Sequence, residues 1–126
     1  MAVNSSNAGD VPPFDRVTVE KLRAEASRGA EDFFPMYVRY LCEDIRKAGS
    51  DLDVAARELR GAQLAEIGHR LRGAVGNFGA EPLIGLCRQL ERLVKDGDIP
   101  AALELVPVLQ AELRRVEAAA LALLPA

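Results

Sequence analysis

Apolar residues recur three or four positions apart over most of the chain, which is the spacing of amphipathic helices. Glycine, proline and aspartate interrupt the pattern at intervals and divide it into four long stretches. Gly49 and Ser50 provide a place for a kink in the first stretch, and Pro107 a local irregularity in the last. The helices expected from the four stretches cover about Asp32–Arg60, Gly61–Gly79, Pro82–Asp96 and Ile99–Leu123.

Residues with known preferences for helix ends lie at these boundaries. Asp32 is suited to cap the first long helix, and Pro35 is tolerated in its first turn. Gly79 follows the second helix in a position suited to a left-handed residue, and Pro82 falls in the first turn of the third. The run Asp96–Asp98, with glycine at its centre, predicts a tight turn before the last helix.

A shorter helix is expected ahead of these four. It covers about Thr18–Ser27, with Thr18 as the N-cap and Gly29 closing it. The segment Met1–Pro13 has no periodicity and is rich in Asn, Ser, Gly and Pro, which predicts a disordered lead before one domain over 14–126. Short connections favour antiparallel neighbours. The predicted fold is therefore all-α, an antiparallel up-down-up-down four-helix bundle with a short additional N-terminal helix.

Composition restricts the classes of protein to which this domain can belong. The 126 residues are 49% hydrophobic and 28% charged, enough for one core. A net charge of −3 argues against a general nucleic-acid binder. No apolar run reaches the roughly 20 residues of a membrane span and no signal-peptide plan is visible, so a cytoplasmic protein is expected. Cys42 and Cys87 fall on apolar stripes, which predicts packing rather than a disulfide or a metal site.

The only histidine, His69, is the strongest candidate for chemistry. The apolar stripe of its helix consists of Leu64, Gly68, Leu71, Val75 and Phe78. Because His69 lies roughly 140° from the centre of that stripe, its imidazole should point to solvent beside Ala65, Gly73 and Gly76. A glycine inside a helix costs about 1 kcal/mol relative to alanine. Close approach of another molecule to the imidazole is one reason for two glycines on this face. The alternative is that the glycines serve packing or helix bending.

The positions that follow the histidine form a longer motif. It runs from the histidine through a leucine, a basic residue and small residues to Gly-Ala, and ends on a leucine-rich helix closing with Leu-Glu. Its members are His69, Leu71, Arg72, Gly73, Ala74, Gly76, Asn77, Phe78, Gly79, Ala80, Leu83, Cys87, Leu90 and Glu91. This segment resembles the signature of the histidine-containing phosphotransfer (Hpt) domain family. The signature covers under a quarter of the chain, and the flanking helical pattern extends the resemblance from about Thr18 to the C-terminus.

The motif departs from the family at Arg72, where the resemblance implies a lysine. Either residue places a positive charge about one turn from His69, at i+3. Arginine can fork two hydrogen bonds onto phosphoryl oxygens, so we expect Arg72 to screen phosphoryl charge with a changed geometry. Activity should survive with an altered rate or partner preference. The alternative is that Arg72 is an ordinary solvated residue beside Arg70.

The resemblance implies a phosphorelay intermediate in two-component signal transduction. His69 would accept a phosphoryl group from a receiver-domain phosphoaspartate, through its ring nitrogen remote from the backbone, and pass it to another receiver domain. The partners would be receiver domains of response regulators and of a hybrid sensor histidine kinase, which bring the Mg²⁺. Ala65, Gly73, Gly76 and Asn77 are the expected partner-binding residues.

The chain would then be a phosphoryl carrier and not a stand-alone kinase. It has no Gly-rich phosphate loop and no acidic metal cluster near His69, so we expect no cofactor or metal of its own. No symmetric helical seam is visible, so a monomer is the default. Two other readings stay open. One is an adaptor that docks a receiver or kinase domain without transfer, and the other is a structural module in which His69 is an incidental surface residue.

Overall fold

The computed structural model describes residues 11–125 and contains no strand in this part of the chain. The predicted all-α class is therefore confirmed. Its helices are α2 (Arg16–Ala26), α3 (Phe34–Arg57), α4 (Gly61–Val75), α5 (Glu81–Lys95) and α6 (Ile99–Leu121), with a 3₁₀ turn, η1, over Gly76–Phe78. Most of the predicted disordered lead, Met1–Pro13, falls on residues 1–10, which lie outside the described residues.

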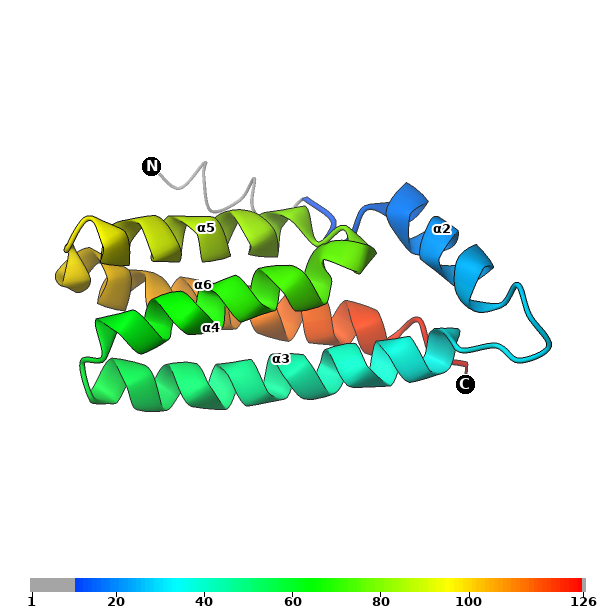
Figure 1. The fold of residues 1–126 in the computed structure, drawn as a ribbon, viewed down its shortest axis with the longest axis horizontal. Helices are drawn as coiled ribbons and strands as arrows, with labels where there is room; N and C mark the ends of the chain where they lie inside the picture. Colours follow the sequence, from blue (N-terminus) through cyan, green and yellow to red (C-terminus); the bar gives the residue numbers. More distant parts are fainter. Residues whose placement is uncertain (1–10, 126) are drawn as a thin grey trace.

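The four long helices form an antiparallel bundle. Figure 1 shows α3, α4, α5 and α6 running alternately in opposite directions, as the short connections predict. Both α3 and α5 pack against α4 and α6, so the four helices close a ring around one core. The bulkiest fully buried side chains of that core are Phe34, Leu52, Leu64, Leu83, Leu90 and Leu109. In the ring, the groove between α4 and α5 lies across the bundle from the groove between α3 and α6.

The short helix α2 lies at the end of the bundle where α4 finishes (Figure 1). It packs against the 3₁₀ turn and against α3. The ring of Phe78 in that turn lies 5.6 Å from the ring of Phe14 and 6.4 Å from that of Phe34, between centroids. The guanidinium carbon of Arg23 on α2 lies 4.3 Å from the centroid of Phe34. These aromatic contacts hold the C-terminal end of α4 in place.

The ends of α2 differ from the prediction. The N-cap is Asp15, whose carboxylate accepts hydrogen bonds from the backbone N–H of Thr18, at 3.3 Å, and from its hydroxyl. Thr18 therefore lies inside the helix and is not its cap. The helix ends at Ala26 with Ser27 as the C-cap, before Gly29. Both Asp and Thr are good capping residues, and the register of the first turn decided between them.

The long helices also end slightly earlier than predicted. Helix α3 is one helix through Gly49 and Ser50 but stops at Arg57, because Leu59 takes a left-handed backbone conformation with φ of 55°. Asp32 contributes to its start by accepting a hydrogen bond from the N–H of Phe34 at 3.0 Å. Helix α6 continues through Pro107 and ends two residues before the predicted Leu123. Pro82 falls in the first turn of α5, as predicted.

Gly79 connects the end of the histidine helix to α2. Its φ is 65°, which confirms the predicted left-handed conformation, and its carbonyl accepts a hydrogen bond from the N–H of Asp15 at 2.9 Å. A Cβ at this position would lie 2.9 Å from the Cβ atoms of both Asp15 and Thr18. Gly79 therefore serves the packing of α2 as well as the turn.

We expect Gly79→Ala to lower the free energy of unfolding by about 2 kcal/mol, since it combines left-handed strain with a steric clash. Gly97→Ala is the matched control, because Gly97 has φ of 79° but no atom within 4 Å of the added Cβ. It should cost about 1 kcal/mol, the strain alone. Urea unfolding measures both. Equal losses in the two variants would show that α2 does not constrain Gly79.

Candidate functional site

His69 lies in the middle of α4 and points away from the core. The helix buries Leu64, Ile67, Gly68, Leu71 and Val75. The side chain of His69 is 73% exposed, which confirms the outward orientation predicted from the helical projection. An imidazole this open is available to a second macromolecule.

Within residues 11–125, two side chains make polar contacts with the imidazole, and both contacts are at Nδ1. Nη2 of Arg72, one turn further along α4, is 3.2 Å from Nδ1, and Oε1 of Glu91 on α5 is 3.5 Å from it. Neither contact involves Nε2, the ring nitrogen remote from the backbone. Within the described part of the chain, Nε2 therefore has no hydrogen-bond or ion-pair partner.

Arg72 and Glu91 form a two-point ion pair beside the histidine. Nε of Arg72 donates to Oε2 of Glu91 at 2.6 Å, and Nη2 donates to Oε1 at 3.1 Å. The hydrogen bonds from Arg72 are the main cause that lowers the pKa of the Glu91 carboxyl below its ordinary value of 4.5. Arg72 is therefore paired with Glu91, and whether it is more than an ordinary solvated residue beside Arg70 depends on the phosphoryl role proposed below. A carboxylate already occupies the fork that was predicted for phosphoryl oxygens.

Glu91 belongs to the matching motif, but sequence reasoning assigned it no role. It lies on α5, and only the packing of α5 against α4 brings it to His69. Gly68 permits that packing, because a Cβ there would lie 3.3 Å from the backbone oxygen of Cys87 and 3.6 Å from Cγ of Glu91. The signal in the sequence was a glycine on the apolar stripe, where a larger residue would normally be buried.

Gly73 and Gly76 differ from Gly68 and Gly79 in their surroundings. A Cβ at Gly73 or Gly76 would meet no atom within 4 Å. Packing within the described part of the chain therefore does not require either residue to be glycine, although each has the lower helix propensity of glycine. The alternative that they serve internal packing finds no support in the structure.

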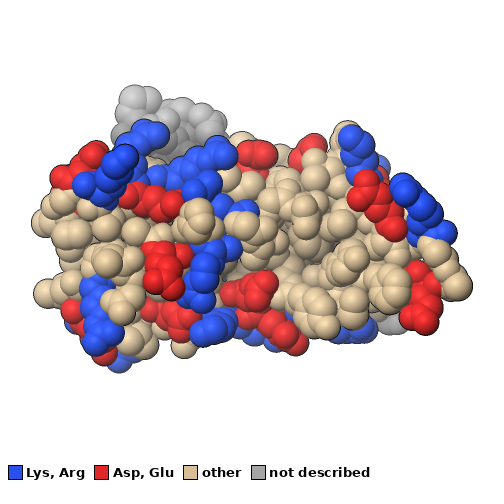
Figure 2. Space-filling model, viewed as in Figure 1, with Lys and Arg blue, Asp and Glu red and all other residues tan. Residues whose placement is uncertain are grey.

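The other two predicted contact residues lie on either side of His69. Ala65 is half-buried one turn before it on α4, whereas Asn77 is exposed in the 3₁₀ turn. Asn77 lines a groove between α2, α3 and the end of α4, together with Tyr37 and Tyr40 of α3. Figure 2 shows few charged side chains over the area between α2, α3 and the end of α4, although charged side chains return at the outer end of the molecule, where α2 lies. Asn77 is therefore part of a sparsely charged surface near the site.

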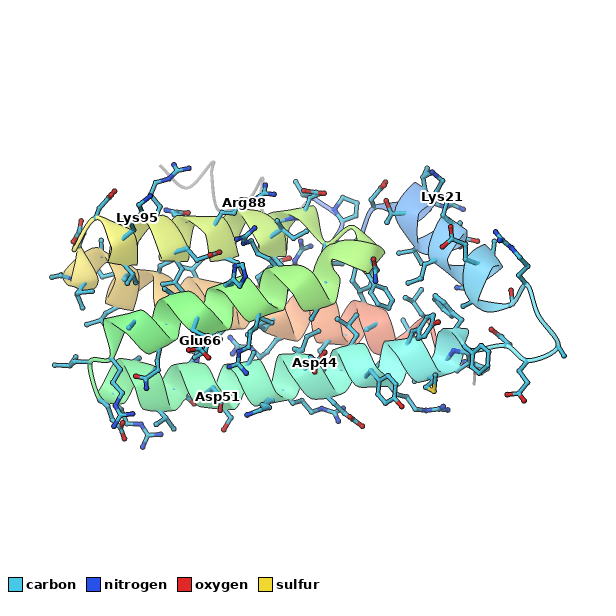
Figure 3. The ribbon with its side chains drawn as sticks, viewed as in Figure 1. Lys21, Asp44, Asp51, Glu66, Arg88 and Lys95 are labelled. Atoms are coloured by element: carbon cyan, nitrogen blue, oxygen red, sulfur yellow. The ribbon has the colours of Figure 1, made fainter. Side chains whose placement is uncertain are left out.

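Charged residues border the rest of the site (Figure 3). Glu66 and Asp51 lie along the groove between α3 and α4, where Asp51 is paired with Arg70 at 3.6 Å. Arg88 and Lys95 project from the outer side of α5. The surface along α3 and α4 is thus mixed in charge and partly neutralised, whereas α5 carries Arg88 and Lys95 on its outer side and presents the carboxylate of Glu91 to the histidine.

The two cysteines are packing residues. Both are buried and free of disulfide bonds. Burial is the main cause that raises the pKa of the Cys87 thiol to about 12, so it stays protonated at neutral pH and is a poor nucleophile.

Within residues 11–125, no set of three His, Cys, Asp or Glu side chains is placed to hold a metal ion. In the same range no helix is long and apolar enough to cross a bilayer.

Comparison with known proteins identifies the family. A family model for the Hpt domain matches residues 36–119, which is more than half of the chain. The chain belongs to the Hpt domain family. The matched region contains His69, Arg72 and Glu91, and it begins after α2. The chain is thus a histidine phosphotransfer domain, and the resemblance seen in the sequence is confirmed.

A solved structure shares the fold of this Hpt domain over nearly its whole length. It is the crystal structure of histidine-containing phosphotransfer protein B (HptB) from Pseudomonas aeruginosa PAO1, with a TM-score of 0.79. The match covers 90% of this chain and 95% of the other, at 22% sequence identity. It therefore extends the shared fold beyond the family model. No curated protein matches the sequence.

The ion pair between Arg72 and Glu91 should make the free energy of unfolding of the Hpt domain depend on pH. Because the pKa of Glu91 is lower in the folded than in the unfolded protein, its pairing stabilises the fold above about pH 4.5, and this contribution is lost as the pH falls through the lower folded-state value. Urea unfolding of the wild type and Glu91→Gln should therefore differ slightly at pH 7 and converge in acid. A difference that grows on acidification would contradict this assignment.

Proposed function

We propose that this Hpt domain is a phosphorelay intermediate that carries the phosphoryl group on Nε2 of His69. The observation that carries the proposal is the imidazole itself, which is 73% exposed and has both of its side-chain contacts at Nδ1. Nε2 is thus the nitrogen that a partner can reach. The donor is the phosphoaspartate of a receiver domain, and the acceptor is the aspartate of another.

The transfer step follows from ordinary phosphoryl chemistry. The lone pair of Nε2 attacks phosphorus, the bond between phosphorus and the aspartyl oxygen breaks, and the aspartate leaves as a carboxylate. A proton held on Nδ1 stays there during the step, beside the carboxylate of Glu91. The reverse sequence of bond changes passes the group to the next receiver. The partner brings the Mg²⁺ that neutralises phosphoryl charge.

The residues around His69 have separate parts in this proposal. Arg72 screens the charge of the phosphoryl group, which requires its guanidinium to exchange Glu91 for phosphoryl oxygens at least in part. Gly73 and Gly76 leave open space beside the imidazole for the receiver's active-site loops. Ala65 and Asn77 extend the contact surface along α4 and toward the groove at its end.

A transfer assay tests the proposal. The purified protein is mixed with a panel of receiver domains carrying radiolabelled phosphate, and the label on this chain is tested for stability in alkali and lability in acid, the behaviour of phosphohistidine. We expect label from at least one receiver of a hybrid sensor kinase, and its loss on adding a response-regulator receiver. Complex formation with no label from any receiver would support the adaptor instead.

A further inference from the structure

The outer face of α5 carries basic side chains that the rest of the described chain does not neutralise. Arg88, Arg92 and Lys95 follow one another at spacings of four and three residues, which places them on one side of the helix. All three are exposed, and Figure 3 shows Arg88 and Lys95 projecting away from the bundle. Within residues 11–125, none of the three has a hydrogen bond or an ion pair. These three residues are the α5 basic stripe, which is bounded by Glu81 in the first turn and Asp96 at the C-cap.

The neighbouring helix offers no comparable free charge. Both arginines of α4 are paired with carboxylates, Arg70 with Asp51 and Arg72 with Glu91. The chain as a whole is acidic, with a formal net charge of −3. The α5 basic stripe is therefore a local reversal of the overall charge, close to the exposed imidazole.

The stripe borders the surface that a partner bound at His69 would cover. Glu91, whose carboxylate contacts the imidazole, lies between Arg88 and Arg92 in the sequence. At 1.5 Å per residue, Arg88 and Lys95 are displaced from Glu91 by only about 5 and 6 Å along the helix axis. A standard protein interface covers about 800 Å² of each partner, a patch about 30 Å across. A partner of that size centred on His69 would therefore meet the stripe at its edge.

The composition of the stripe favours an acidic protein surface over a lipid or a nucleic acid. The exposed large hydrophobic side chains of the described residues all lie outside α5, so this helix has nothing to insert into a membrane. Helix α5 also has no aromatic residue on which a base could stack. Cations at the rim of a protein interface pair with carboxylates of the partner, and there they act on the association rate and on the choice of partner.

We propose that the α5 basic stripe selects receiver domains that carry an acidic patch beside their active site. The inference rests on the proposed function, which supplies the receiver as the partner at His69. The stripe attracts such a receiver and turns its active site toward the imidazole, but takes no part in the transfer step. Receivers whose surface is neutral at that place gain nothing from the stripe, and those with a basic surface are repelled.

Association rates with unphosphorylated receiver domains test the proposal without phosphotransfer. The probes are receivers of the transfer panel, sorted by the charge of the surface beside the active-site aspartate. The triple variant Arg88→Gln, Arg92→Gln, Lys95→Gln should associate with acidic-patch receivers about tenfold more slowly than the wild type at low salt, as expected for electrostatic steering. The difference should vanish near 1 M salt, where the Debye length is about 3 Å. Receivers with a neutral patch should bind both proteins at the same rate.

The triple variant Arg39→Gln, Arg57→Gln, Arg114→Gln is the matched control, because it removes the same charge from another part of the surface. All three arginines are exposed and, among the described residues, have no ion pair. Arg114 lines the groove between α3 and α6, and Arg39 and Arg57 lie on the side of α3 that carries Arg46, which pairs with α6. The control should associate at the wild-type rate.

Several results would overturn the proposal. They are failure of the wild type to bind any acidic-patch receiver, equal rates for the wild type and the stripe variant, and equal losses in the stripe and control variants. Binding of the wild type but not the stripe variant to phosphatidylserine vesicles, with unchanged receiver rates, would assign the stripe to a lipid instead. Slower association of the stripe variant with no label from any receiver would count against the proposed function alone.

Discussion

We expect replacement of His69 by glutamine to abolish phosphoryl acceptance and to leave the helical bundle intact. Glutamine has the approximate reach of histidine, but its amide nitrogen has no lone pair available to attack phosphorus. The exposed side chain contributes nothing to the core, so the free energy of unfolding should change by no more than about 0.5 kcal/mol. Acid-labile label measures acceptance, and circular dichroism with urea unfolding measures the fold.

Glu66→Gln is the control for this variant. Glu66 is exposed on the same helix, one turn before His69, and it lies outside the pair of side chains that contact the imidazole. It should accept phosphate within about twofold of the wild-type rate, as expected for a surface change of this size. Label that persists on His69→Gln would place the acceptor on another residue. A loss of helicity would mean that the imidazole is part of the fold.

Gly73→Leu should lower the rate of transfer from a receiver by about 100-fold or more, while the fold becomes no less stable. The glycine lies one turn after His69 on the exposed face of α4, and the space beside it is open. A leucine there would hold the imidazole away from the active site of the receiver. A displacement of about 1 Å from the productive geometry can lower a rate by about 100-fold. Leucine is the better helix former, so stability should be unchanged or up to about 1 kcal/mol higher.

Gly49→Leu is the matched control for the steric effect. Gly49 also lies within a helix and has no atom within 4 Å of an added Cβ, but it lines the groove between α3 and α6, across the bundle from the α4–α5 groove. Its transfer rate should equal that of the wild type. If Gly73→Leu also transfers at the normal rate, the glycine is not there to admit a partner, and its cost to the helix needs another reason.

The ion pair with Glu91 changes the interpretation of Arg72 as a free positive charge in the motif. Considered on its own, the residue is a positive charge at i+3 from His69, equivalent to the lysine that the family signature implies. In the fold it is already neutralised by Glu91 through two hydrogen bonds. In the proposed relay, the phosphoryl group would therefore have to compete with the carboxylate of Glu91 before Arg72 could screen its charge.

The sequence by itself determined the helices, their order and the direction in which His69 points. Each of these follows from local rules, because apolar spacing sets which face of a helix is buried and residues such as Gly79 and Pro82 mark its ends. The boundaries at Thr18 and Arg60 were wrong by two or three residues. The histidine helix, predicted to reach Gly79, is α-helical only to Val75 and continues as a 3₁₀ turn. There, several residues compete for the same capping role, and their free energies differ by too little for local pattern to decide.

Only the tertiary structure decided what surrounds the imidazole. Glu91 is 22 positions away from His69 in the sequence, on a helix whose approach depends on the absence of a side chain at Gly68. Packing also distinguishes the glycines that close contacts require from those at which a side chain would meet no other atom. The sequence alone does not show this difference. A motif can name the reacting residue because its type and exposure are local properties. Its charge partners depend on distances between helices, which only packing fixes.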